Sequence, residues 1–214
     1  NVRYLLGLAG MAEALNQQLD PVHRRFQVKL PVDFPNLRMG NFSTVQTNAT
    51  GPFALIEFTG ALPRAKLYDQ WQVSTNDQAT LDQLAGPQFD PARVVLVAGE
   101  VALSPASVAT NPPPVAVEFV ADQYTPKHVV LRTKAEVPTV LLLTDKYDPN
   151  WTVTVDGKPA LVLRCNFLMR GVALPAGQHD VVFRFQPPVS ALYVSLAAVV
   201  MALALAGYLG WGEW

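Results

Sequence analysis

The chain of 214 residues carries 16 Lys and Arg against 17 Asp and Glu, and a net charge of −1 provides no positive field that would attract nucleic acid or anionic lipid. A single cysteine, Cys165, excludes an internal disulfide and a metal site built from several cysteines. Eighteen prolines, many beside short β-branched runs, favour an antiparallel β-rich body over a helical one.

The N-terminal portion, residues 1–98, predicts an α+β domain because short strand patterns alternate with helix patterns. Strands are expected at 2–8, 53–58, 64–73 and 93–97, and a first helix at 11–18.

A second helix is expected after Asn76. Either Asn76 or Asp77 can cap the free backbone N–H groups of its first turn, and the Gly-Pro pair at 86–87 ends it. The spacing of Leu81 and Leu84 predicts that both are buried.

Residues 99–114 predict a linker or a long loop, since they include a Ser-Pro pair and three consecutive prolines at 112–114. Apolar residues then alternate more regularly, which indicates short strands joined by tight turns. These strands are expected at 115–120, 128–134, 140–144, 151–155, 160–163, 172–174 and 181–185.

About seven such strands predict an antiparallel β-sandwich, of the jelly-roll or immunoglobulin-like kind, over residues 115–187. Asp156 and Gly157 supply the positive φ angles of a two-residue hairpin turn. Trp151 alternates in phase with Val153 and Val155, so we expect its ring to be largely buried in the sandwich core. The overall prediction is a mainly β fold.

Residues 189–211 contain no charged side chain and predict a transmembrane helix, because 23 residues at 1.5 Å each span roughly 34 Å against a hydrocarbon core of about 30 Å. A buried core helix is the alternative. Aromatic side chains near the two ends match the interface belts of membrane helices. They are Tyr193, Tyr208, Trp211 and Trp214.

Small residues recur every four positions along the same segment, which makes one side narrow enough for close approach of another membrane helix. They are Ala198, Ala202, Ala206 and Gly210. Membrane lipid and other transmembrane helices or subunits are therefore the expected partners.

Short stretches spread over the chain resemble, in their order, the C-terminal extracytoplasmic region of YfhO-type bacterial membrane proteins, a family of large polytopic, glycosyltransferase-like proteins. The stretches are NVRYLL (1–6), ALPRA (61–65), FDP (89–91), LLLTD (141–145), DPNW (148–151), VDGK (155–158), LRCN (163–166), RGV (170–172), PAGQH (175–179) and FRF (183–185).

This resemblance implies an outer-face domain on a bacterial cytoplasmic membrane, with the bulk of the chain on the periplasmic or outer side. It does not carry catalysis over, because in such transferases the catalytic acidic residue lies in a loop near the first membrane helices and the lipid-linked donor docks among many helices. This sequence has one such helix and no such loop. We therefore expect no enzymatic activity of this chain alone.

The residues themselves support that expectation. His23, His128 and His179 lie in separate segments without metal-ligand spacing, and no serine has the setting of a nucleophile elbow. No catalytic, cofactor-binding or metal-binding residues are assigned, and no cofactor is expected.

One candidate contact for a sugar or a partner is the segment that contains Tyr147, Asp148, Asn150 and Trp151. Aromatic faces there would stack on a sugar ring while the polar side chains bond its hydroxyls. The alternative, which we favour, is a turn followed by a core tryptophan. Arginines 164, 170 and 184 are expected to pair with Asp145, Asp156 or Asp180 more than to hold a ligand.

Three functional hypotheses follow. The chain is foremost a non-catalytic, single-pass, membrane-anchored accessory subunit of a larger bacterial assembly, for example a respiratory or photosynthetic complex. The second hypothesis is the outer C-terminal lobe of a polytopic glycosyltransferase that acts on lipid-linked sugars, and the third is a carbohydrate-binding module. The sequence opens at Asn1 without an initiator Met or a leader pattern, so we expect either a leader that was removed or a longer polypeptide upstream. Several membrane spans upstream would favour the second hypothesis.

Overall fold

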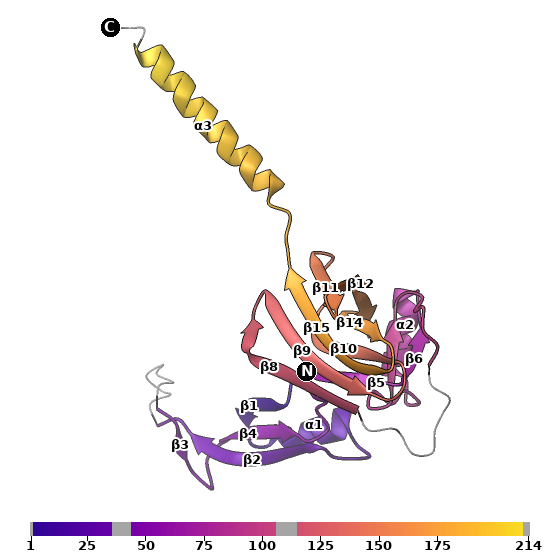
Figure 1. Ribbon diagram of the computed structural model, residues 1–214. Helices are drawn as coiled ribbons and strands as arrows, with labels where there is room; N and C mark the ends of the chain where they lie inside the picture. Colours follow the sequence, from indigo (N-terminus) through magenta and orange to yellow (C-terminus); the bar gives the residue numbers. More distant parts are fainter. Residues whose placement is uncertain (1, 36–43, 106–114, 212–214) are drawn as a thin grey trace. The chain divides into compact units, whose positions relative to one another are not determined.

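The computed structural model describes residues 2–35, 44–105 and 115–211, and the chain divides into two compact units. Unit 1 comprises Asn1–Arg64 and unit 2 comprises Ala65–Trp214. The chain is mainly β, as predicted, and its strands form three sheets (Figure 1).

Unit 1 is a small antiparallel sheet with one helix on it. The strands lie in the order β1-β4-β2-β3, and α1 follows β1 in the chain. Ala12 of α1 is buried against Ala54 and Ile56 of the central strand β4, which explains why α1 places small residues on that side. The bounds are β1 Tyr4–Leu8, α1 Met11–Leu19, β2 Phe26–Asp33, β3 Gln46–Thr47 and β4 Phe53–Phe58.

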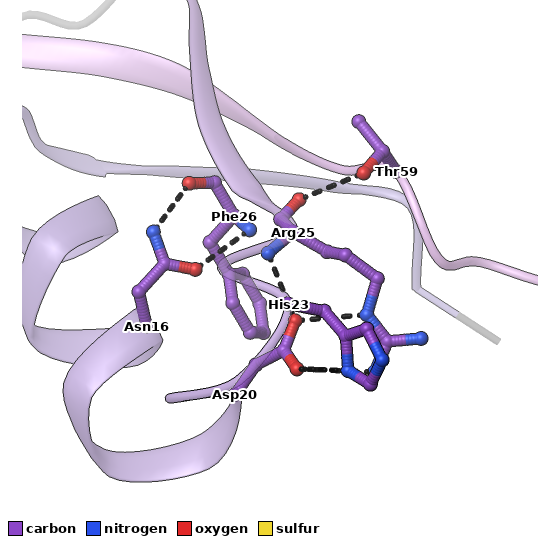
Figure 2. Close-up of polar contacts among 6 residues, drawn as sticks. All are labelled: Asn16, Asp20, His23, Arg25, Phe26 and Thr59. Atoms are coloured by element: carbon purple, nitrogen blue, oxygen red, sulfur yellow. Dashed lines mark hydrogen bonds and ion pairs between the residues drawn. The ribbon is translucent and has the colours of Figure 1, made fainter.

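Two side chains near the end of α1 fasten the helix to the start of β2 (Figure 2). The amide of Asn16 donates to the carbonyl oxygen of Phe26 at 2.8 Å and its oxygen accepts from the Phe26 N–H at 2.9 Å. The Asp20 carboxylate accepts from the backbone and the side chain of Arg25, both at 2.8 Å. Both polar side chains are buried, so these bonds satisfy groups that water cannot reach.

Acid is expected to loosen this junction. The side-chain hydrogen bond from Arg25 is the largest cause that lowers the pKa of Asp20, to about 2, whereas an unfolded Asp titrates near about 4. Because the folded pKa is the lower one, the carboxylate contributes stability above about pH 4, and that contribution is lost as the pH falls towards about 2.

Asp20→Asn should abolish this contribution, so amide exchange over 11–33 should speed up near neutral pH and change less on acidification. Glu13→Gln is the control, since Glu13 is an exposed partner of Arg24. Unchanged exchange in the Asp20 variant would contradict the assignment.

Unit 2 contains two sheets that face each other across one buried cluster (Figure 1). Leu131 and Phe183 come from one sheet, Leu141 and Val172 from the other, and all four are essentially inaccessible. Alternation along 177–185 sends apolar side chains inwards and most polar ones outwards. This is the layered arrangement of a β-sandwich. The six-stranded sheet is covered on both faces, because a second buried cluster that includes Val140 lies on its other side.

The six-stranded sheet has the order β5-β10-β14-β13-β7-β6, and the five-stranded sheet has the order β12-β11-β15-β9-β8. The pairs are antiparallel apart from β6 with β7, which are parallel. In the first sheet the bounds are β5 Ala65–Tyr68, β6 Gln70–Val73, β7 Val94–Val97, β10 Thr139–Lys146, β13 Leu163–Cys165 and β14 Met169–Leu174. In the second they are β8 Val115–Thr125, β9 His128–Ala135, β11 Trp151–Val155, β12 Lys158–Ala160 and β15 Gly177–Phe185.

Two sequence expectations differ from these sheets, and a third falls mostly outside the described residues. The sequence placed a domain over 1–98, whereas the chain divides after Arg64, because β5 pairs with β10 and β7 pairs with β13. The single strand expected at 64–73 is two strands in the same sheet. Of the linker expected at 99–114, residues 106–114 lie outside the described residues.

The predicted hairpin and helix cap are both present. Asp156 and Gly157 have φ angles of 52° and 76° and join β11 to β12, with Val155 opposite Lys158. Asn76 caps α2 (Asp77–Ala85) by accepting from the Ala79 N–H at 2.9 Å.

The buried side of α2 was predicted wrongly. Leu81 is exposed and Leu84 is half-buried, whereas Thr80 is buried and its hydroxyl lies 2.7 Å from that of Ser74. A polar contact with the end of β6 therefore sets the helix orientation.

The last element is α3, Ser190–Trp211. Among the described residues, no helix combines the length and the hydropathy needed to cross a membrane, so the transmembrane helix predicted at 189–211 is not confirmed.

Candidate functional site

The candidate sugar contact at 147–151 lies between β10 and β11 and folds as a turn. The carboxylate of Asp148 accepts from the backbone N–H and the side-chain amide of Asn150, both at 2.8 Å. The backbone N–H of Trp151 then donates to the backbone carbonyl of Asp148 at 3.1 Å. The polar side chains of this segment are thus engaged with each other, as an Asx turn requires.

Trp151 is partly exposed, and its ring packs against the core cluster between the two sheets, broadly as predicted. A cation covers one face of the ring. The guanidinium carbon of Arg170 lies 3.8 Å from the Trp151 ring centroid, a close cation–π contact. Arg170 donates to the Asp145 carboxylate at 2.9 Å and to the Lys146 carbonyl at 3.1 Å, and its side chain is only 5% exposed. Arg170 thus pairs with Asp145, one of the three aspartates that the sequence offered as partners for its arginines, and one stacking face of Trp151 is occupied.

We call this group, formed by Asp145, Trp151, Arg170 and Phe185, the Trp151 cluster. Phe185 contributes a ring 5.3 Å from that of Trp151. The next residue, Gln186, donates its N–H to the Asn150 carbonyl at 2.9 Å. The cluster therefore lies at the end of β15 from which the chain continues towards α3. Its use as a sugar contact stays a prediction.

A groove with a volume of about 530 Å³ lies at the opposite end of β15. Charges of both signs alternate across its strands, with Glu118 opposite Arg132 and Arg132 opposite Asp180 in register. The Arg132 guanidinium is 3.7 Å from the Asp180 carboxylate, and both side chains are about two-thirds exposed. Because charges of opposite sign lie side by side, this end presents a mixed, nearly neutral surface. Exposed ion pairs of this kind contribute little stability.

His179 and Asp156 meet beside this groove. The Nδ1 atom of His179 lies 2.7 Å from the Asp156 carboxylate, whose other oxygen accepts from the Asp180 N–H at 2.9 Å. The contact with His179 is the largest cause that lowers the pKa of Asp156. This pair fastens the β11–β12 hairpin to β15.

The second ring nitrogen of His179, Nε2, is buried and has no hydrogen-bond partner among the described residues. The sequence separates the two residues by 23 positions, and no spacing signal connects them.

The other histidines lie apart from this pair. His23 is 3.5 Å from Asp20 in unit 1, and His128 begins β9 in unit 2. In the described parts of the chain no three His, Cys, Asp or Glu side chains gather as metal ligands. Arg164 pairs with Asp77 of α2, a partner that the sequence did not indicate.

The small-residue positions of α3 point away from the rest of the chain. Ala198, Ala202 and Ala206 are exposed, as are the rings of Tyr193 and Tyr208. The side chains at Gly210, Trp211 and Trp214 lie outside the described residues. Helix packing and membrane-interface contacts at these positions stay predictions.

Residues 117–197 match the family described as bacterial membrane protein YfhO, which confirms the resemblance over that region. The matched region begins in β8, includes the hairpin and β15, and ends inside α3. Neither the curated proteins nor the solved structures contain a match.

Proposed function

We propose that this chain is the non-catalytic outer lobe of a YfhO-type bacterial membrane protein, held at the periplasmic face of the cytoplasmic membrane by α3. The observation that carries the proposal is the extent of the family match, which runs without a break from the sandwich into α3. The region that matches a family of membrane proteins thus includes strands of both sheets of the sandwich and part of the following helix.

The physical character of α3 supports membrane attachment. Its 22 residues contain no charged side chain, so none of them opposes contact with lipid. Large apolar side chains are exposed around the whole helix, among them Leu192, Val199 and Leu203. Water opposes such exposure, whereas lipid tails cover the same surface without a penalty.

The lobe role, as opposed to catalysis, is supported by what its polar groups do. Asp156, His179 and Arg170 are engaged in contacts that fix strands and turns. By the resemblance, the catalytic loop and the donor site of such transferases lie in the polytopic body. The lobe would then position a glycan or cover the body from outside.

The accessory-subunit hypothesis requires a helix partner in the membrane. The exposed stripe of Ala198, Ala202 and Ala206 suits close packing against a neighbouring helix backbone. The same stripe would serve an outer lobe that packs against its own polytopic body, so it fits both hypotheses.

Two double variants of the full chain, expressed in bacterial cells, test the attachment. Val199→Arg with Leu203→Arg places two charges near the centre of α3 and costs about 5–7 kcal/mol of insertion free energy. We expect wild type to stay in the membrane fraction after alkaline carbonate washing and this variant to leave it. Protease added to spheroplasts should digest the wild-type sandwich if it lies outside.

Ala202→Leu with Ala206→Leu is the matched second variant, because it keeps α3 apolar and fills the stripe. It should remain in the membrane and co-purify poorly with its helix partners. Wild type washing off as readily as the arginine variant would refute attachment through α3, and protection of the sandwich in spheroplasts would refute the outer location.

A further inference from the structure

A second groove in unit 2, which we call the glutamine groove, lies between β6, the end of α2 and the start of β7. Its volume is about 590 Å³. Carboxamides and aromatic rings dominate its lining, and these side chains come from residues 70–72 of β6, from α2 and from the loop at 86–93. They are Gln70, Gln72, Gln83, Gln88, Trp71 and Phe89.

The loop that completes this groove is fixed by hydrogen bonds. The hydroxyl of Tyr68, a buried residue whose pKa burial raises to about 12, donates to the Pro91 carbonyl at 2.8 Å. The carboxylate of Asp90 accepts from the Ala92 N–H at 2.9 Å, and the Asp90 carbonyl accepts from the N–H groups of Arg93 and Val94. A groove held in this way needs little reorganisation to receive a ligand.

Two of the carboxamides orient each other. The side-chain amide of Gln83 donates to the side-chain oxygen of Gln72. This bond uses one of several hydrogen-bonding positions on each group, so the Gln72 amide and the Gln83 oxygen keep capacity for a ligand. A paired donor and acceptor of this kind suits neighbouring hydroxyl groups, which both donate and accept.

The charges of the groove select against ionic ligands. Its lining contains one cation, Arg93, and one anion, Asp90, so neither sign predominates. A phosphate or a carboxylate would meet one arginine and an opposing carboxylate. A neutral ligand with hydroxyl groups on its rim and an apolar C–H face for Phe89 matches the lining better, while the largely buried Trp71 forms part of the groove wall.

We propose that the glutamine groove binds a neutral carbohydrate, with its hydroxyls on the carboxamides and one ring face on Phe89. This inference rests on the proposed outer-lobe function, which would bring the groove close to glycans. It adds the class of ligand and the site that binds it. β6 is an edge strand of its sheet, so an extended peptide paired with β6 is the competing occupant. The peptide is disfavoured because it would bond the strand backbone and leave the clustered carboxamides without a role.

Calorimetric titration of the full chain tests this proposal in a polyoxyethylene detergent, since a sugar-based detergent would compete. The probes are maltohexaose, cellohexaose and chitohexaose, with an unrelated uncharged decapeptide as the alternative. At least one saccharide should bind with a Kd of about 1 mM or tighter. Gln72→Ala with Gln83→Ala should weaken that binding at least about tenfold, which corresponds to about 1.4 kcal/mol.

Gln178→Ala with Gln186→Ala is the matched control, because it removes two glutamines of unit 2 that lie outside the glutamine groove. It should bind like wild type. Phe89→Ala is a second groove variant that leaves the carboxamide pair intact, and it should weaken binding as well. Unchanged melting temperatures establish that the variants remain folded.

Binding of the peptide alone, no saccharide binding, or equal loss in the control would overturn the proposal. These outcomes are separate from the membrane tests, because titration in detergent depends neither on insertion of α3 nor on the side of the membrane that the lobe occupies.

Discussion

Replacing Arg170 by alanine is expected to lower the free energy of unfolding of unit 2 by about 3–5 kcal/mol. The substitution would leave the Asp145 carboxylate and the Lys146 carbonyl without their Arg170 hydrogen bonds. It would also uncover the ring of Trp151, on which the guanidinium lies at 3.8 Å. Removing one member of a buried ion pair costs far more than removing an exposed one, since the remaining charge stays desolvated.

Urea denaturation in detergent micelles, followed by tryptophan fluorescence, measures this effect, because Trp71 and Trp151 both lie in unit 2. Arg132→Ala is the matched control, since Arg132 makes an exposed ion pair at 3.7 Å and should change stability by less than about 1 kcal/mol. Equal losses in the two variants would show that burial of Arg170 does not govern its contribution.

The parts of the fold that sequence predicts well are those decided by neighbouring residues. The Asp-Gly pair at 156–157 fixed the hairpin because only residues tolerant of positive φ suit that turn. Asn76 sets the start of α2 by another local interaction, because its side chain accepts a hydrogen bond from the backbone N–H three residues on.

Long-range pairing is what the sequence left undecided. Nothing in the local pattern of 65–73 shows that β5 pairs with β10 some 75 positions later, so the proline-rich segment at 99–114 looked like a domain boundary. β2 was missed although apolar residues alternate along it at 26, 28, 30 and 32. Pro31 argues against an interior strand, and a bulge between Val28 and Leu30 shifts the register of β2 in the structure.

The same limit applies to the candidate sites. The sequence indicated the aromatic and polar residues at 147–151, and it offered Asp145 among the partners of three arginines, but it gave no sign that Arg170 covers Trp151. The glutamine groove escaped detection for another reason. Its carboxamides come from β6, α2 and a loop. Glutamines separated in this way form no motif, and in the sequence they look the same as glutamines on a solvated surface.

Gly171→Val is expected to cost about 3 kcal/mol or more, the upper end of the range for overpacked cores. Gly171 lies in the centre of the six-stranded sheet, opposite Leu142 on one side and Leu163 on the other. A Cβ atom there would meet the Leu141 carbonyl oxygen at 2.6 Å and the Cys165 sulfur at 2.8 Å. The first contact is with backbone, so β14 or β10 would have to shift.

Gly99→Val is the control, because a Cβ at position 99 would meet nothing within 4 Å. Adding Cys165→Ala to Gly171→Val separates the two contacts, since it removes the sulfur and leaves the carbonyl in place. We expect only partial recovery in urea denaturation. Full recovery of the free energy of unfolding would mean that only the buried thiol excludes a side chain at position 171. The backbone of β10 would then be able to shift, although it lies inside the sheet.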